Sequence, residues 1–402
     1  MIVFFTVFLD LVGFGILIPI QPFYAETLGA SPAIVTLLGA AYSAMQFLFA
    51  PFWGRLSDKI GRRPVMLTSI ALGTIGYFLF GFVTTLPLLF MARMLSGFGN
   101  ANIGAAQAII ADTTSVKDRA KGMGLIGAAF GLGFIFGPAL GGVFSQYSLS
   151  APAYVAAGLG FLNLILAYFI LPETFSPGRN VGAHRTRALL GISIKDLEHG
   201  FQLPNVSHVL MIFLLGTIGF SVMEQVLGLF IEHTWLLDRG IGFESAKEAA
   251  RLTTYMLVIV GVTSTIVQGG LIGKFAKRFG ERHLLSAGLL INGLSFIGMV
   301  LIGRSGVFPL MFLIAIFTAM GSGLTNPSQV SLLSQLVDEQ ERGTVLGLGQ
   351  SFAALGRTVG PAAAGLLFEY SPSLPFLAAS ALMITCSFVA ARLPKTIGNP
   401  RT

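Results

Sequence analysis

The decapeptide GRLSDKIGRR occupies positions 54–63, between two long apolar runs. Half of its residues are charged, whereas 11% of the whole chain is charged and 54% is hydrophobic. A related decapeptide, GKFAKRFGER, occupies positions 273–282. A short charged segment that interrupts apolar sequence, and then recurs, indicates loops between membrane-spanning helices in a chain built from two copies of one unit.

Apolar segments recur along the whole chain at about twenty residues, the length at which an α-helix crosses a bilayer. Many of the 50 glycines fall within them, and small residues let helices pack closely in lipid. We therefore predict an all-α membrane protein with twelve spans, at 2–24, 34–54, 65–83, 86–111, 120–146, 152–171, 206–231, 250–273, 283–302, 307–336, 342–368 and 374–392.

A polar segment divides these spans into two sets of six. We predict an N-terminal half at 1–172, a cytoplasmic central loop at 173–203 and a C-terminal half at 204–402. The two halves share short sequence motifs in the same order along the chain. One example is Gly137-Pro138, which recurs as Gly360-Pro361. Two related six-helix halves are typical of secondary transporters, whose substrate site lies near the bilayer midplane.

The distribution of Lys and Arg predicts the orientation in the membrane. Four of the 25 basic residues fall in loops on one side, at Arg239, Lys247, Arg251 and Arg304, and two more, Arg93 and Arg357, lie within spans. The remainder lie on the other side, which the positive-inside rule assigns to the cytoplasm. We therefore expect a multi-pass protein of the inner or plasma membrane, with both termini in the cytoplasm.

Several motifs resemble one family. GRLSDKIGRR is similar to the signature of the loop between spans 2 and 3 of the major facilitator superfamily. DLVGFGILIPIQP, RMLSGFGNANIGAAQAIIAD and GFIFGPALGG resemble motifs in spans 1, 4 and 5 of its twelve-span drug:proton antiporters, which include tetracycline-resistance and multidrug efflux proteins. The resemblance implies the major facilitator fold and antiport across the membrane.

The tetracycline exchangers carry acidic residues in spans 3 and 9. This chain has no Asp or Glu at 64–83 or 284–302. This chain therefore lacks the acidic residues that, in the tetracycline exchangers, matter for a metal-chelated substrate.

Charged residues within spans are the candidates for coupling transport to protons. A charge at the bilayer centre costs about 3 kcal/mol, so it calls for a function or a partner. Asp10 in span 1 and Glu224 in span 7 are the candidate acids, because a carboxyl group removed from water takes up a proton more readily. The alternative for Asp10 is an acid held by structural hydrogen bonds or by an Arg, with no role in coupling. The alternative for Glu224 is an acid that faces the pore near the outer water. For Arg93, the resemblance implies assistance to proton transfer.

Polar stripes on two spans predict a substrate cavity. Arg93, Gly97, Asn100, Gly104 and Gln107 are spaced to share one helix face, and Thr318, Ser322, Asn326 and Gln329 form a similar stripe in span 10. Polar groups on such a face need partners other than lipid. We predict that the cavity is lined by Asn100, Gln107, Gln225, Asn326, Gln329 and Gln46. The alternative is that the stripes join helices, as we expect for Asn163.

The opening decapeptide also predicts a cytoplasmic gate. Asp58 is suited to the N-terminus of a helix, where the dipole favours negative charge. The resemblance implies that this helix is the span beginning near Arg342, and that Arg62 pairs with Asp112. Gly54 and Gly61 would let the backbones approach. In the second copy Lys277 replaces Asp58, which suggests that only the first copy carries the gate.

The Gly-Pro stretch in span 5 predicts close helix packing. It contains Gly133, Gly137, Pro138, Gly141 and Gly142. Proline removes a helix donor, and glycine permits close approach. The resemblance implies that this helix helps to close the pathway against leak.

Other classes of protein are disfavoured. The five His and one Cys form no metal-ligand spacing, and no phosphate-binding loop is present, so we expect neither an enzyme nor a metal or other cofactor. The basic residues lie in loops between spans, which does not suit a nucleic-acid surface. We expect a monomer that exports small amphipathic compounds using the proton gradient. Uptake of a nutrient by symport or facilitation, and a non-transporting receptor, are the alternatives.

Overall fold

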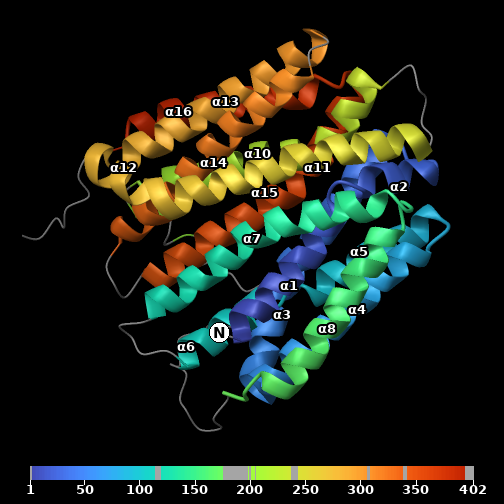
Figure 1. Ribbon diagram of the computed structural model, residues 1–402. Coiled ribbons are helices and arrows are strands. Elements are labelled where there is room, and N and C mark those ends of the chain that lie inside the picture. The colour runs from blue at the N-terminus through green and yellow to red at the C-terminus, as the bar shows by residue number, and fades with distance from the viewer. Residues whose placement is uncertain are drawn as a thin grey trace, which may run out of the picture. The chain divides into compact units, whose positions relative to one another are not determined.

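The computed structural model describes residues 2–113, 119–174, 198, 201–203, 205–236, 243–305, 308–337 and 342–393 (Figure 1). These residues form helices and no strand. The first helices along the chain are α1 (Ile2–Leu17), α2 (Gln21–Thr27), α3 (Pro32–Ile60), α4 (Arg62–Phe82), α5 (Leu86–Gly99), α6 (Ile103–Thr113), α7 (Arg119–Ser145) and α8 (Ala151–Ile170). They are followed by α10 (Val206–Trp235), α11 (Phe243–Ile266), the π-helix η2 (Val267–Leu271), α12 (Ile272–Phe279), α13 (Glu281–Ser305), α14 (Pro309–Gln335), α15 (Arg342–Tyr370) and α16 (Leu374–Ala391).

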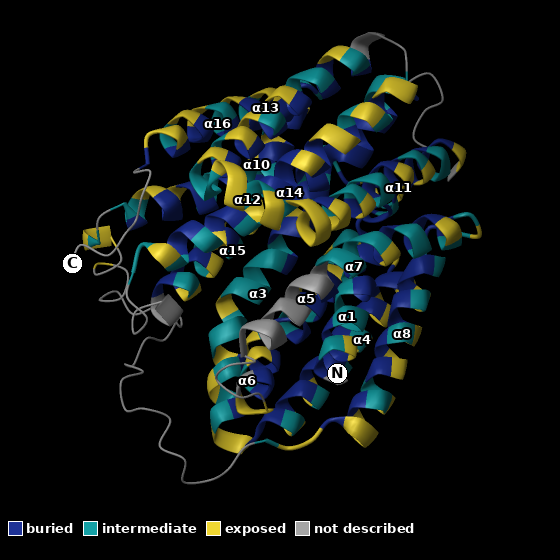
Figure 2. Ribbon diagram, turned by 60° about the vertical axis from the view of Figure 1, so that its left-hand side comes forward, coloured by how far each residue is buried: buried dark blue, intermediate teal, exposed yellow. Residues whose placement is uncertain are grey.

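Each of the twelve predicted spans coincides with one helix or with consecutive helices. Among the described residues, eight helices are long and apolar enough to cross a bilayer, and nine if α1 and α2, bent by 45°, form one span. Figure 2 shows exposed residues along most of the helices. Large apolar residues are among them, such as Phe82 at 72% and Phe169 at 78% exposure. Their exposure suits contact with lipid rather than water.

Packing divides the chain into two compact units. The first comprises Met1–Ser193 and Arg239–Val258, and the second Ile194–Asp238 and Ile259–Thr402. The division runs through α11. The predicted boundaries at 172 and 204 stay a prediction, and most of the predicted central loop lies outside the described residues.

The same helix pairs pack in each unit. In the first unit α1 packs on α7 and α8, and α4 packs on α5 and α8. In the second, α10 packs on α15 and α16, and α13 packs on α14 and α16. These pairs correspond one to one along the two halves, so the duplication seen in the sequence is also present in the packing.

Glycines of the Gly-Pro stretch form a close seam between α1 and α7, which run side by side in Figure 1. A Cβ added to Gly137 would lie 2.6 Å from Cα of Gly15, and one added to Gly133 would lie 2.6 Å from Cβ of Leu11. Gly141 on α7 faces the carbonyl of Ile16, which also lies on α1. The predicted close packing is therefore present, and it fixes the height of α1 relative to α7.

The second unit repeats this seam between α10 and α15. A Cβ on Gly356 would lie 2.8 Å from the carbonyl oxygen of Leu214, and one on Gly360 would lie 3.2 Å from Cα of Ile218. Ile218 thus takes the place of Gly15, and five residues earlier Phe213 takes the place of Asp10. The predicted coupling acid therefore has an apolar counterpart in the second half.

Candidate functional site

Two asparagine side chains hold the carboxyl group of Asp10. Asn163 on α8 donates from Nδ2 to Asp10 Oδ1 at 2.9 Å, and Asn102 donates from Nδ2 to Asp10 Oδ2 at 3.1 Å. Each carboxyl oxygen therefore accepts one amide hydrogen. The carboxyl group links α1 to α8 and to the break between α5 and α6.

Both amides use their second hydrogen as well. Asn163 Nδ2 also donates to the carbonyl of Thr6 at 3.0 Å, and Asn102 Nδ2 donates to Ser69 Oγ at 2.9 Å. Ser69 in turn donates to the carbonyl of Met66. A buried polar group is stable only when it is hydrogen-bonded, and these donors are fully used. We call Asp10, Asn102, Asn163 and Ser69 the Asp10 cluster.

The sequence pattern did not identify Asn102. A continuous helix over 86–111 would place Asn102 away from the stripe that contains Asn100. In the structure α5 ends at Gly99 and α6 begins at Ile103, and both Asn100 and Asn102 are buried in the break. The prediction of a single helix face from Arg93 to Gln107 is therefore wrong. Adjacent Gly and Asn residues at 99–102 were the available signal for a break.

The other side of the break holds a second polar group around Tyr42. Asn100 Nδ2 donates to the hydroxyl oxygens of Tyr42 at 3.2 Å and Tyr77 at 2.5 Å. Gln46 Nε2 donates to Tyr42 at 3.2 Å and to the carbonyl of Asn100 at 3.1 Å. These bonds join α3 and α4 to the end of α5.

Arg93 is 2% exposed and lies over the ring of Tyr42, with its guanidinium carbon 4.5 Å from the ring centroid. The ring of Tyr42 also stacks on Phe14 of α1, with the ring centroids 4.9 Å apart. A cation over an aromatic face is favourable, by about 2 kcal/mol when removed from water. Tyr42 therefore contacts both the cation on α5 and α1, the helix that carries Asp10.

The remaining stripe residues divide by burial. Gly104 and Gln107 on α6 are exposed, whereas Gly97 packs against the backbone of Tyr42. In the second unit Asn326 is exposed, Gln225 is half-buried, and Gln329 is 3% exposed with Nε2 3.5 Å from the carbonyl oxygen of Ile212. That these residues line a substrate cavity stays a prediction. The Gln329 contact favours the alternative of a helix-joining role for that residue.

Glu224, the second candidate acid, is 8% exposed on α10. It belongs to the second unit, whereas Asp10 belongs to the first, so the structure does not place the two acids relative to each other. Its role in coupling stays a prediction.

The predicted pair between Arg62 and Asp112 is present at the start of α4. Arg62 Nε lies 3.4 Å from Asp112 Oδ2, and Nη1 contacts Asp58 Oδ1 and Ser57 Oγ. Arg62 is buried at 7% exposure, and two carboxylates and a hydroxyl group surround its guanidinium group.

Gly61, with φ of 111°, makes the turn from α3 into α4, a conformation that glycine adopts without strain. A Cβ on Gly54 would meet nothing within 4 Å, so close approach at Gly54 has no support within its own unit.

Sequence reasoning missed Glu173 as part of this group. Its carboxylate accepts hydrogen bonds from the backbone N–H groups of Arg62 at 3.0 Å and Arg63 at 3.2 Å. It therefore caps the N-terminus of α4, where the helix dipole favours negative charge. We call Asp58, Arg62, Asp112 and Glu173 the gate cluster; that Asp58 also faces the start of the span at Arg342 stays a prediction.

Comparison with known proteins places this fold. The family model of the Major Facilitator Superfamily matches residues 3–270 and 249–401, and the chain belongs to this superfamily. Tetracycline resistance protein, class C, of Escherichia coli is 30% identical over 389 residues, which cover 95% of this chain and 93% of that protein. Multidrug resistance protein 2 of Bacillus subtilis (strain 168) is 28% identical over 383 residues, covering 94% of this chain and 91% of that protein.

The fold is shared with solved transporters. The crystal structure of the nucleoside transporter NupG matches with a TM-score of 0.76 at 17% identity, covering 97% of each chain. The predicted fold class, an all-α membrane protein of the major facilitator type, is confirmed. The chain is a multi-pass membrane transporter rather than an enzyme.

Proposed function

We propose that this protein is a secondary active transporter that exports small amphipathic compounds in exchange for protons. The observation that carries the proposal is the Asp10 cluster: a carboxyl group within a membrane span, with both oxygens bound by amides. The names of the relatives, multidrug resistance and tetracycline resistance proteins, support export of drug-like compounds.

Asp10 is the proposed proton site, and Glu224 is the second candidate. In the outward-facing state a proton enters the membrane carboxyl group, and in the inward-facing state it leaves as substrate binds. Arg93 assists by its positive charge, which Tyr42 holds close to α1. One charge crossing 100 mV supplies about 2.3 kcal/mol, which sustains a substrate gradient of about fiftyfold.

The proposed transport path is supported by polar residues that each unit exposes within its apolar spans. Gln107 is exposed in the first unit, and Asn326, Gln350 and Arg357 are exposed in the second. A polar group against lipid is unfavourable, so these positions favour a water-filled path. The gate cluster would close this path on the cytoplasmic side, where we also place both termini. We propose a monomer in the inner or plasma membrane.

Transport into liposomes tests the mechanism. The purified protein is reconstituted into liposomes, and accumulation of ethidium, which carries a permanent charge, is measured after a pH gradient is imposed. An antiporter accumulates dye when the lumen is acidic, and a symporter does so when the exterior is acidic, whichever way the protein is inserted. We expect accumulation only with the acidic lumen.

Variants of the two acids identify the proton site. Asp10→Asn should abolish gradient-driven accumulation while leaving expression and folding intact, and Glu224→Gln should weaken it. Equal accumulation by both variants and the wild type would exclude these acids as proton sites. Accumulation with the acidic exterior would replace export by uptake, the alternative expected from the sequence.

A further inference from the structure

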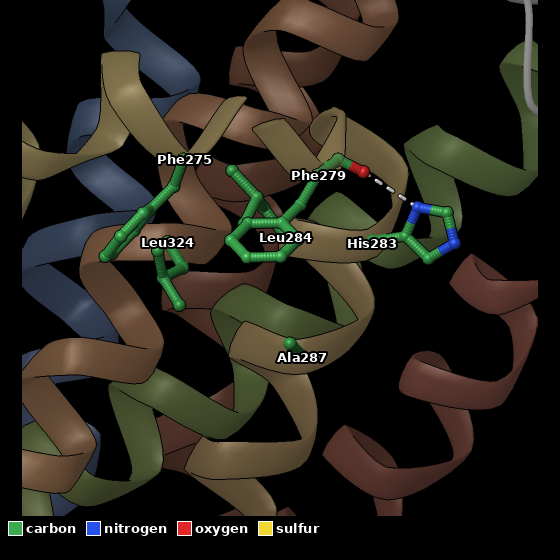
Figure 3. Close-up of a pocket in the computed structure, with 6 residues that line it drawn as sticks. All are labelled: Phe275, Phe279, His283, Leu284, Ala287 and Leu324. Carbon is green, nitrogen blue, oxygen red and sulfur yellow. Dashed lines mark hydrogen bonds between the residues drawn. The ribbon is translucent and has the colours of Figure 1, made fainter. Parts of the chain in front are cut away.

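The second charged decapeptide borders an apolar groove in the second unit. The groove has a volume of about 310 Å³ and is lined by Phe275, Phe279, His283, Leu284, Ala287 and Leu324, from α12, α13 and α14 (Figure 3). Its walls are apolar, since His283 uses Nδ1 to contact the carbonyl of Phe279. Buried Val267, Leu284 and Leu324 pack together beneath it.

The helix above this groove is unusual. The π-helix η2 interrupts the span before α12, and glycines at 269, 270 and 273 have no neighbour within 4 Å of an added Cβ. None of the residues of α12 is buried, and in Figure 2 the helix carries the colours of exposed and intermediate residues. The interruption lies next to the helix that lines the groove, and π-helical turns often occur at functional sites.

Cations lie along α12 next to the phenylalanines that line the groove, and the guanidinium carbon of Arg278 is 5.4 Å from the ring centroid of Phe279. Lys274, Lys277 and Arg278 are exposed and are spaced to share one helix face. Among the described residues none of the three has a carboxylate within ion-pair distance. The one acid in this decapeptide, Glu281, accepts hydrogen bonds from Ser331 and Gln335 on α14.

The first copy of the decapeptide differs in this respect. There Asp58 and Asp112 bind Arg62, so the positive charge of Arg62 is balanced within the protein. In the second copy Lys277 occupies the position of Asp58, and the positive charge faces outward beside an apolar groove. This combination matches a ligand that has an acyl chain and an anionic headgroup, because basic pockets between membrane helices bind such lipids.

We propose that the groove between α12, α13 and α14 binds one anionic phospholipid. An acyl chain lies in the groove against Phe279, Leu284 and Ala287, and the phosphate lies against Lys274, Lys277 and Arg278. The groove is at the small end of ligand pockets, about 300–1,000 Å³, which suits part of one chain. The proposal is independent of the direction of transport.

Native mass spectrometry of the full chain in detergent tests this site. Dioleoyl phosphatidylglycerol and dioleoyl phosphatidylcholine are titrated separately, and we expect one phosphatidylglycerol to bind more tightly than phosphatidylcholine. Lys274→Gln with Arg278→Gln should weaken that step about 25-fold, at about fivefold for each charge. Arg55→Gln with Lys59→Gln changes the equivalent positions of the first copy and should leave the binding of phosphatidylglycerol unchanged.

A second pair of variants tests the groove itself. Ala287→Phe fills the groove without a change of charge and should weaken phosphatidylglycerol binding, with Ala287→Leu available if the larger residue impairs folding. Leu294→Phe, at an exposed position of the same helix, should bind as the wild type does. Glycerol phosphate, which lacks acyl chains, should not compete. Equal losses in the two charge variants, unchanged binding in both Ala287 variants, or competition by glycerol phosphate would each overturn the lipid site.

Discussion

At the scale of single residues, the Asp10 cluster distinguishes one half of the molecule from the other. Asp10 accepts one hydrogen bond on each oxygen, and the equivalent position in the second half is Phe213, which is buried and apolar. Helix association alone does not require an acid, since Phe213 occupies the same place in the repeated seam. The Asp10 cluster therefore serves a role that the first half has and the second half lacks at this position. A proton site is such a role.

Removal of either amide should impair transport more than folding. Asn102→Ala and Asn163→Ala each remove a hydrogen bond to a carboxyl group, and bonds to charged groups contribute about 1.5–3 kcal/mol. We expect export to fall by about tenfold or more and its dependence on pH to change. The measurement is ethidium accumulation in liposomes over a series of lumenal pH values.

Asn292→Ala provides the matched control, because Asn292 is a buried asparagine on α13 that lies against α14. It should lower stability and leave the pH dependence of export as in the wild type. If all three variants change only stability, the amides of the Asp10 cluster are structural contacts and nothing more.

At the scale of helices, two features position this cluster. The glycine seam sets α1 against α7, and the break after Gly99 turns Asn102 toward Asp10. A helix that continued through residues 100–102 would separate Asn100 and Asn102 by about 200° around its axis. The break instead lets Asn100 bind Tyr42 and Tyr77 while Asn102 binds Asp10.

The glycine seam should not tolerate a methyl group. Gly137→Ala places a Cβ 2.6 Å from Cα of Gly15, so α1 and α7 must separate. Overpacking of this kind costs about 1–3 kcal/mol, and the thermal melting temperature of the purified protein should fall. Gly158→Ala on α8, where a Cβ meets nothing within 4 Å, should not lower it. Equal melting temperatures for Gly137→Ala and the wild type would mean that the seam is not tightly packed.

At the scale of the whole molecule, transport requires that one side opens while the other closes. The gate cluster ties the start of α4 to Asp112 at the end of α6 and to Glu173 after α8. These contacts make one end of the first unit a connected charged group. That Asp58 also acts on the helix beginning near Arg342 stays a prediction from the sequence, and the following variant tests it.

Asp58→Asn should therefore lower export without a matching loss of expression. The charge–dipole contribution is about 1–2 kcal/mol, so export should fall by about five- to thirtyfold. The measurement is ethidium export normalised to the amount of protein in the membrane. Glu248→Gln, which removes an acid from a surface pair with Arg251, should export normally. Loss of expression in parallel with export would assign Asp58 to folding instead.

The sequence by itself determined the class of protein, the helical spans and the duplication. Apolar runs long enough to cross a bilayer are local properties of the chain, and a repeated motif survives in the sequence without reference to folding. The charge pattern likewise identified Asp10, Arg93, Asp58 and Arg62, because a charge beside or within an apolar run is readily seen.

Only the tertiary structure decided which residues meet. The partners of Asp10 lie 92 and 153 residues away along the chain, and Glu173 lies 111 residues from the helix it caps. Helical periodicity predicts a shared face only while the helix continues, so it failed at the break that contains Asn100 and Asn102. Hydrogen bonds between distant helices depend on the heights and rotations set by packing, which no local pattern encodes.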